Sequence, residues 1–323
     1  MDRNLALNLV RVTEAAALNC ARYLGRGDKN LADEAAVNGM RKMFDTLNID
    51  GVVVIGEGEM DEAPMLYIGE QIGKATPDSI KLDIAVDPLD GTNAVAKGIS
   101  NAISVVAVAP RGCLLHAPDM YMNKIAVGPK AKGKVNLDMS VEEILKNLSV
   151  ALNKNISDIT VTMLDRPRHE GLIKEIRRLG ARIKLFQDGD VAAAIATCFD
   201  DSGVDVLLGI GGAPEGVIAA AALKCMGGEF QGRLHPLTDE ECERCKAMGL
   251  DDVNKLLTME DLVKGNEVVF AATGITNGEL LKGVVYYGNN MAKTYSVVMR
   301  AETGTIRFIE AIHRLDKKPE YAK

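Results

Sequence analysis

Three stretches of the sequence repeat one pattern, in which an apolar run ends in a loop of glycine and acidic residues. The runs are VVVI, IKLDIAV and VDVLLGI, and they lead into GEGE, DPLDGT and GGAPEG. A short apolar run bounded by such residues is typical of a buried strand. Because strand ends meet at one edge of a sheet, the pattern predicts that acids distant in the sequence come together.

The acids of these loops form the first candidate site. They are Glu57, Glu59 and Asp61 in the first loop, Asp87 and Asp90 in the second, and Glu215 in the third. Several carboxylates a few ångströms apart cannot all stay ionised without a counter-charge. A hard divalent cation supplies that charge, and an all-oxygen ligand set suits Mg²⁺ or Mn²⁺. The loops therefore predict a divalent-metal site.

Each acid also has a purely structural interpretation. Asp87 can cap the turn formed by Asp90 and Gly91, and Glu215 can complement the dipole of the helix that follows it. Asp33, which we place in the first turn of a helix, is on spacing alone more typical of a capping residue than of a ligand. The metal interpretation therefore depends on finding three such loops in one chain.

The loop DPLDGT also carries a candidate anion site. If Gly91 makes a tight turn and Thr92 opens a helix that runs to Lys97, the loop presents backbone N–H groups and a hydroxyl to a phosphate. We therefore expect Asp90, Gly91 and Thr92 to contact metal and phosphate together.

A second set of polar residues follows two strands in the later half of the chain. Arg166 and Arg168 end one strand, where guanidinium groups match phosphate oxygens. Asp188 and Asp190 end the next and can accept hydrogen bonds from sugar hydroxyls. The alternatives are a basic start of a surface helix for the arginines, and a turn with an N-cap for the acids. Tyr121 can donate to a phosphate, although the sequence favours an ordinary strand aromatic.

The order of predicted elements indicates an α/β (α+β) protein with two lobes. A length of 323 residues corresponds to about two domains. Two amphipathic helices, separated at 25–30, fill the first 45 residues, and we also expect a helix at 65–72 and a strand at 112–117. From 159 onward strands and helices alternate, which predicts parallel βαβ units. We place the boundary near residue 155, giving a metal- and phosphate-binding lobe (1–155) and a sugar-binding lobe (156–323).

Charge and hydropathy exclude several classes of function. The net charge is −7 and the pI about 5.3, which argues against a nucleic-acid partner. The apolar runs are too short to span a membrane, and charges interrupt the N-terminal helix where a signal peptide would be continuous. We expect a cytoplasmic protein whose six cysteines are reduced.

Three short motifs imitate known sites. The string GPKAKGK has the spacing of a phosphate-binding P-loop, but Val135 replaces the Ser or Thr that would bind Mg²⁺. In GIGGAP, Pro214 stands where a dinucleotide fingerprint needs glycine. Cys242 and Cys245 have the spacing of zinc ligands, but they lie on a charged helix with few conceivable partners. We expect no function from these motifs.

Longer motifs carry a resemblance to a known family. GRGDKN, IGEGEMDEAPMLYIGE, DPLDGT, HAPDMYM, QDGDVAAAI and GIGGAPEG resemble the class II fructose-1,6-bisphosphatases of bacteria and the related cyanobacterial enzymes. The likeness runs from Arg3 to about Asp316. It implies the α-β-α-β-α layered fold of the lithium-sensitive sugar phosphatases. It also implies metal-dependent hydrolysis of the 1-phosphate of fructose 1,6-bisphosphate, in gluconeogenesis or in carbon fixation.

The resemblance also implies roles for individual residues. The metal ligands would be Asp33 and Glu57 for one ion and Asp87, Asp90 and Glu215 for a second, with Mn²⁺ or Mg²⁺ bound. The substrate contacts would be Asp90, Gly91, Thr92, Tyr121, Arg166, Pro167, Arg168, Asp188, Gly189, Asp190 and Gly212. The bacterial enzymes often have Glu in place of Asp90 and Lys in place of Arg166, which bears on metal preference and on phosphate geometry.

The expected mechanism is attack of an activated water on the phosphate. We expect Glu57 to help hold the ion that activates the water, Thr92 to orient that water, and Asp61 with Lys29 to complete the acid network. A bifunctional fructose-1,6-/sedoheptulose-1,7-bisphosphatase, an inositol-monophosphatase-like enzyme and a catalytically silent metal or phosphate sensor are the alternatives. We also expect a homo-oligomer.

Overall fold

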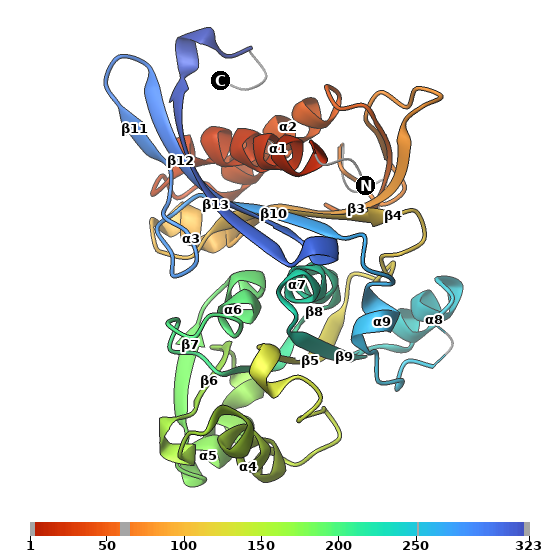
Figure 1. Ribbon diagram of the computed structural model, residues 1–323, viewed down its shortest axis with the longest axis vertical. Helices are drawn as coiled ribbons and strands as arrows, with labels where there is room; N and C mark the ends of the chain where they lie inside the picture. Colours follow the sequence, from red (N-terminus) through yellow and green to blue (C-terminus); the bar gives the residue numbers. More distant parts are fainter. Residues whose placement is uncertain (1–3, 59–64, 251, 320–323) are drawn as a thin grey trace. The chain divides into compact units, whose positions relative to one another are not determined.

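The chain forms two compact units in the computed structural model, which describes residues 4–58, 65–250 and 252–319. The first unit contains residues 1–114 and 265–323, and the second contains 115–264 (Figure 1). This division differs from the predicted boundary near residue 155. The reason is that the strands of the C-terminal segment pair with strands of the N-terminal segment, so one unit is built from both ends of the chain.

The first unit contains one mixed sheet and three helices among its described residues. The helices are α1 (Leu5–Cys20), α2 (Lys29–Phe44) and α3 (Thr92–Lys97), with 3-10 turns at Ala21–Tyr23, Ala301–Thr303 and Leu315–Lys317. The strands are β1 (Ile49–Ile55), β2 (Gln71–Ile72), β3 (Ile80–Asp90), β4 (Ile103–Pro110), β10 (Val269–Gly274), β11 (Val285–Tyr287), β12 (Met291–Arg300) and β13 (Thr305–Arg314). Their order is β11-β12-β10-β4-β3-β1-β2, and β13 pairs with β12.

Helices α1 and α2 pack side by side on one face of this sheet (Figure 1). Their inward positions, such as Leu9, Ala16 and Met40, are fully buried, which confirms the amphipathic pattern of the first 45 residues. Strands β1 and β3 are parallel, so the loops that follow them emerge at the same edge of the sheet. That edge carries the first two acidic loops.

Two expectations for this unit are wrong. Residues 65–72 form turns and the short strand β2 instead of a helix, because Leu66 takes a left-handed φ of 57° and interrupts the helical pattern. Residues 112–117 do not form a strand of the sheet. Strand β13 was not expected from the sequence, since charged residues interrupt its apolar pattern.

The second unit is a five-stranded sheet covered by helices on both faces. Its helices are α4 (Val141–Leu152), α5 (Glu170–Arg178), α6 (Asp190–Ala196), α7 (Ala213–Met226), α8 (Asp239–Ala247) and α9 (Met259–Leu262), with 3-10 turns at Pro129–Ala131, Ile156–Asp158 and Pro167–His169. Its strands are β5 (Tyr121–Val127), β6 (Thr160–Leu164), β7 (Arg182–Phe186), β8 (Val206–Gly212) and β9 (Glu229–Leu234), in the order β7-β6-β8-β5-β9.

Strand β6 is parallel to β7 and to β8, which confirms the predicted βαβ units. Helices α4 and α5 lie on one face of the sheet and α6 and α7 on the other (Figure 1). Helix α4 begins with a capping box, in which the Ser140 hydroxyl accepts from the Glu143 N–H and the Glu143 carboxylate accepts from the Ser140 N–H. Together the two units confirm the mixed α/β class.

The imitating motifs have structural roles. Pro129–Ala131 forms a 3-10 turn in the P-loop-like string. The Cys245 thiol is buried, 3.5 Å from the Met120 sulfur, and all six cysteines are free. None of the helices in the described part of the chain has the length and apolar character needed to cross a membrane.

A buried polar network joins α1 to the last two strands. His313 Nε2 lies 2.7 Å from the Thr294 hydroxyl, which in turn donates to Glu14 Oε1 at 3.0 Å. Burial, aided by the charge of Lys318, lowers the pKa of His313 to about 4, so the ring is neutral at pH 7. Burial raises the pKa of Glu14, which has the opposite effect on the pH dependence of stability.

We predict that His313 makes the fold less stable in mild acid. Between pH 6.5 and 4 the unfolded state binds a proton at this ring that the folded state does not, so stability falls as pH falls through this window. The wild type should lose about 2 kcal/mol more unfolding free energy than His313→Gln between pH 7.5 and pH 5. Urea unfolding at the two pH values measures the difference. Equal losses in the two proteins would contradict this role, and the subtraction removes the contribution of Glu14.

Candidate active site

Asp33 lies on α2, one turn further along than the sequence suggested. The helix begins at Lys29, and its N-cap is Asp28, whose carboxylate accepts hydrogen bonds from the backbone N–H groups of Asn30 and Leu31. The expectation that Asp33 falls in the first turn is therefore wrong, because the cap lies five residues before it. With Asp28 as the cap, the capping explanation of Asp33 no longer applies.

The structure brings Asp33 and Glu57 together with Asp87. The carboxyl groups of Asp33 and Glu57 share a hydrogen bond, and burial raises the pKa of both. The charges of Asp33 and Asp87 raise the pKa of Glu57 further, well above its usual value. These residues come from α2, from the loop after β1 and from the end of β3. The predicted convergence of the first two acidic loops is therefore present within the first unit.

The hydrogen bond between Asp33 and Glu57 is informative about a cation. An ionised carboxylate only accepts hydrogen bonds, so one of the two must carry a proton in the absence of metal. A dication would satisfy the same oxygens with both groups ionised. No group of three or more acidic, His or Cys side chains in the described ranges is arranged to hold an ion by itself. The pair therefore fits a partial ligand set that other oxygens must complete.

The loop after β3 has the predicted turn and helix. Gly91 has a φ of 105°, and an added Cβ would lie 3.1 Å from the Ala102 Cα, so the turn requires glycine. Asp87 Oδ1 accepts a hydrogen bond from the Leu89 N–H, as the turn interpretation expected. Thr92 is the first residue of α3, and its hydroxyl donates to the Leu89 carbonyl at 3.3 Å. Asp90 is 5 % exposed.

The structure shows no site contact for two of the predicted catalytic residues, Lys29 and Asp61, one of which lies outside the described residues. Lys29 is exposed at the first position of α2. Asp61, like Glu59, lies outside the described residues. Their expected partnership therefore stays a prediction.

In the second unit, the predicted arginines converge on the strand ends. Arg166 donates to the Gln187 carbonyl at 2.7 Å and to Asp188 Oδ1 at 3.1 Å. Arg168 donates twice to the Ile210 carbonyl, and its guanidinium lies 4.6 Å from the centre of the Tyr121 ring. Each guanidinium therefore contacts another strand end, which is more than the start of a surface helix requires. Pro167 begins the 3-10 turn between the two arginines.

The glycines at the end of β8 make room for charged side chains. A Cβ added at Gly211 would lie 2.2 Å from Asp190 Oδ2, and one at Gly212 would lie 1.9 Å from Glu215 Oε2. Gly189 caps α6 with a φ of 84°, which places Asp190 in the first turn of that helix. Glu215 occupies the first turn of α7, as predicted. The string GIGGAPEG therefore packs around carboxylates and not around a dinucleotide.

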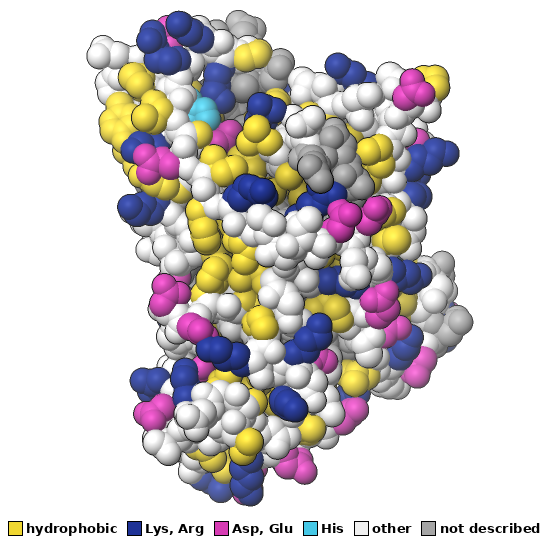
Figure 2. Space-filling model, in the orientation of Figure 1, with side chains coloured by type: hydrophobic (Ala, Val, Ile, Leu, Met, Phe, Trp, Pro, Cys, Tyr) yellow, Lys and Arg dark blue, Asp and Glu magenta, His cyan; other side chains and the backbone are white. Residues whose placement is uncertain are grey.

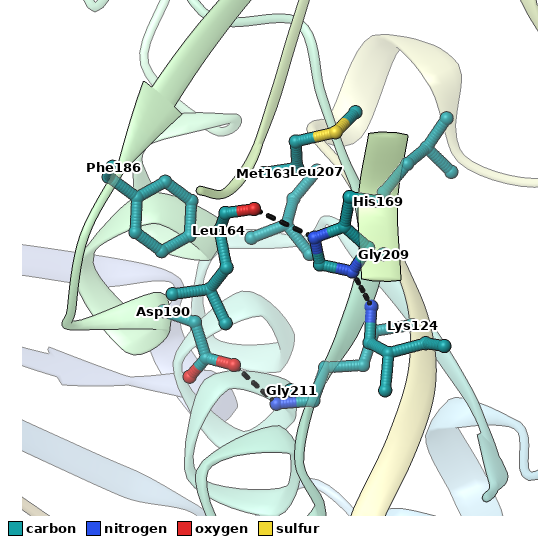
Figure 3. Close-up of a pocket in the computed structure, with 11 residues that line it drawn as sticks. Lys124, Met163, Leu164, His169, Phe186, Asp190, Leu207, Gly209 and Gly211 are labelled. Atoms are coloured by element: carbon teal, nitrogen blue, oxygen red, sulfur yellow. Dashed lines mark hydrogen bonds and ion pairs between the residues drawn. The ribbon is translucent and has the colours of Figure 1, made fainter. Parts of the chain in front are cut away.

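Two residues of this region escaped the sequence analysis. Lys124, in the middle of β5, is 2 % exposed, and its Nζ lies 2.6 Å from Asp190 Oδ2 (Figure 3). His169, the last residue of the 3-10 turn, is buried: Nδ1 lies 2.7 Å from the Leu164 carbonyl and Nε2 accepts from the Ile210 N–H. The only signal for Lys124 is a lysine inside an apolar strand, and His169 has none.

The chain is similar to known proteins over most of its length. The family model described as bacterial fructose-1,6-bisphosphatase, glpX-encoded, matches residues 3–313. A protein of Escherichia coli strain K12 named fructose-1,6-bisphosphatase 1 class 2 is 50% identical over 331 residues, covering 98% of this chain and 97% of the relative. The class 2 enzyme of Haemophilus influenzae is 48% identical over 329 residues, covering 98% of each. Among solved structures, the extragenic suppressor protein SuhB of Bartonella henselae matches with a TM-score of 0.33 and 15% identity, over 61% of this chain and 74% of that one.

Proposed function

The chain belongs to the bacterial fructose-1,6-bisphosphatase family, and from this premise we propose that it hydrolyses the 1-phosphate of fructose 1,6-bisphosphate to fructose 6-phosphate and inorganic phosphate. The general role of this reaction is gluconeogenesis. The observation that carries the proposal is the family match over residues 3–313. The sequence is also 50% and 48% identical to the class 2 enzymes of two bacteria.

A divalent cation is the proposed cofactor, in agreement with the metal dependence of the family. When bound, it supplies positive charge against the phosphoryl oxygens and activates water. Asp33 and Glu57 would hold one ion, and the hydrogen bond they share supports this assignment. Asp87 and Asp90, at the end of β3, would hold a second, and Glu215 stays a predicted ligand. Either Mn²⁺ or Mg²⁺ suits these oxygen ligands.

The residues of the chain would position the substrate and the water. Thr92 would accept a hydrogen bond from the attacking water, since its own proton is given to Leu89. Asp61 and Lys29 would complete the acid network. The substrate contacts proposed in the first unit are Asp90, Gly91 and Thr92, and those in the second are Tyr121, Arg166, Pro167, Arg168, Asp188, Gly189, Asp190 and Gly212.

Release of inorganic phosphate tests the activity. Purified protein is given fructose 1,6-bisphosphate, sedoheptulose 1,7-bisphosphate or inositol monophosphate, with Mn²⁺, with Mg²⁺ or with a chelator. We expect rapid release from fructose 1,6-bisphosphate that the chelator abolishes. Equal rates on the two bisphosphates would identify the bifunctional alternative, and preference for inositol monophosphate or no release at all would contradict the proposal.

The two arginines should distinguish a bisphosphatase from a monophosphatase. Arg166→Met and Arg168→Met each remove a charged hydrogen-bond donor, which is worth about 1.5–3 kcal/mol when it meets a phosphate. We expect KM for fructose 1,6-bisphosphate to rise by roughly 10- to 100-fold and hydrolysis of a simple phosphate monoester to change little. Lys174→Met, at an exposed position on α5, is the control. Equal losses on both substrates would argue against a second phosphate site.

We also infer a homo-oligomer, with β13 as its contact. β13 pairs with β12, no described strand pairs with its other edge, and the exposed side chains of Phe308 and Ile312 share one face. Figure 2 shows apolar side chains gathered at the upper left, where Figure 1 draws β11. If two copies of β13 pair antiparallel around Glu310, Phe308 of each lies opposite Ile312 of the other, and Lys293 balances each glutamate. Light scattering on the wild type and Phe308→Glu tests this contact, which predicts a dimer or larger assembly that the variant weakens.

A further inference from the structure

Burial of the ion pair of Lys124 and Asp190 has a large desolvation free energy. Lys124 is 2 % exposed and Asp190 is 8 % exposed, and their charged atoms are 2.6 Å apart. Figure 3 shows the two side chains pointing toward each other beside Gly211. Taking both charges out of water costs as much free energy as their attraction returns, so such a pair is weak evidence for stability. A role in positioning is the stronger explanation.

Residues at the end of β8 and in the first turns of α7 pack around the Lys124 side chain. A Cβ at Gly211 would lie 3.1 Å from the Lys124 ammonium, and one at Gly216 would lie 3.4 Å from Lys124 Cε. The lysine stem therefore passes between two glycines, which fix the place of its ammonium. A side chain at Gly211 would push the ammonium and the Asp190 carboxylate apart.

The ammonium also acts on Glu215. The charges of Asp190 and Lys124 both act on Glu215, in opposite directions. Two carboxylates and one ammonium thus form a small cluster with one negative charge in excess when all are ionised. Lys124 is the residue that balances most of this charge.

One oxygen of each carboxylate remains available. Within the described part of the chain, neither Asp190 Oδ1 nor Glu215 Oε2 has a hydrogen-bond partner, although both atoms are buried. Because Lys124 binds Asp190 through Oδ2, it leaves Oδ1 as the acceptor. Buried acceptors in native proteins normally find a partner, so these oxygens are suited to a ligand.

We propose that Lys124 is a positioning residue for the sugar: it holds the Asp190 carboxylate in one orientation, so that Oδ1 accepts a hydrogen bond from a sugar hydroxyl. This inference rests on the proposed function, and specifically on the substrate contact of Asp190. Lys124 itself touches neither the sugar nor the phosphate in this account. Its loss should therefore weaken sugar binding more than it slows the chemical step.

The test is Lys124→Met, which keeps the length of the side chain and removes its charge. We expect KM for fructose 1,6-bisphosphate to rise by about 10- to 30-fold at saturating metal, with kcat within about threefold of the wild type. The Kd of fructose 6-phosphate, measured by calorimetry, should rise by the same factor. If Lys124 acts through Asp190, then adding Lys124→Met to Asp190→Asn should raise KM no further.

The chain offers a matched control in the same unit. Lys154 Nζ lies 2.6 Å from Asp205 Oδ1, and Asp205 is 8 % exposed, as Asp190 is. Asp205 precedes the first residue of β8, whereas Gly211 is near its end. Lys154→Met should lower the melting temperature and leave KM and the Kd unchanged. A rise in KM as large as that of Lys124→Met would show that loss of any ion pair to a buried aspartate of this unit explains the effect.

Two outcomes overturn the proposal, and a third concerns the function itself. Unchanged KM and Kd in Lys124→Met would remove the positioning role. If that variant does not fold, Lys124→Leu, which likewise cannot donate to Asp190, replaces it, and an increase in KM below about threefold would be equally adverse. If the wild type releases no phosphate from fructose 1,6-bisphosphate, the proposed function fails before Lys124 is tested.

Discussion

Replacing Glu57 by Gln is expected to lower kcat for fructose 1,6-bisphosphate by at least about 10³-fold, or about 4 kcal/mol of transition-state stabilisation, while making the metal-free protein more stable. The loss of activity follows from the loss of a charged ligand oxygen. The gain in stability follows from burial, since the carboxyl of Glu57 lies against Asp33 and near Asp87. One substitution should therefore move activity and stability in opposite directions.

The pH dependence of this gain has a definite sign. The pKa of Glu57 is higher in the folded state than in the unfolded chain, so its contribution to stability is present in acid and is lost as pH rises through the folded pKa. Gln does not titrate. The variant should melt at a higher temperature than the metal-free wild type at pH 7 to 8, by roughly 3 °C per kcal/mol, and the difference should shrink toward pH 4.

Bound metal should reverse the order of the melting temperatures of the wild type and Glu57→Gln. Adding Mn²⁺ should raise the melting temperature of the wild type more than that of Glu57→Gln, because the variant loses the ion that Asp33 and Glu57 would hold. Glu34→Gln, at an exposed position on α2, is the control and should follow the wild type in every respect. A metal-free Glu57→Gln that is no more stable than the wild type at pH 7 would contradict the account of burial.

Replacing Thr92 by Ala is expected to lower kcat by roughly 10²- to 10⁴-fold, because the hydroxyl that orients the water is lost. The hydroxyl is held by its bond to the Leu89 carbonyl, at the first position of α3. Its oxygen lone pairs therefore have one orientation and can accept a hydrogen bond from water. KM should change much less than kcat, since the substitution leaves the backbone N–H groups of the loop, which are the expected donors to the phosphate.

Thr92→Ser separates the hydroxyl from the packing of the methyl group. It should restore most of the lost turnover, within about tenfold of the wild type, as expected if the hydroxyl is the group that acts. Steady-state kinetics at saturating metal measures both variants. Unchanged turnover in Thr92→Ala would remove Thr92 from the mechanism, and equal losses in both variants would assign its role to packing.

The sequence predicted those parts of the fold that depend on local patterns. Helices α1 and α2 follow from apolar spacing, α4 from its capping box, and α3 from a glycine turn before a short helix. The prediction of a helix at 65–72 was wrong because Leu66 adopts a left-handed conformation that apolar spacing does not reveal. Strand β13 was missed because an edge strand in contact with water needs little apolar alternation.

The division into units could not be read from local patterns. Strand β10 pairs with β4 across more than a hundred residues, and such a pairing leaves no trace in either segment alone. The predicted boundary near residue 155 follows a change of rhythm in the sequence, whereas the chain leaves the first unit at Leu114 and returns to it at Gly265.

The sequence predicted the acidic loops of the candidate site but not the residues that contact them from distant parts of the chain. Acidic loops with glycine are visible in the sequence because both residue types are unusual after an apolar run. Helical spacing alone made Asp33 a cap, and only the family resemblance paired it with Glu57. Lys124 and His169 have roles that depend on Asp190 and on the end of β8, which lie far away in the sequence.

The most direct test of the account is diffraction from crystals grown with Mn²⁺, with anomalous data collected at the manganese edge. The account predicts an anomalous peak between the carboxylates of Asp33 and Glu57, and a second beside Asp87 and Asp90. It also predicts that the first peak is absent in Glu57→Gln. Well-ordered carboxylates at saturating Mn²⁺ without an anomalous peak among them would contradict the claim that these loops converge to bind a metal.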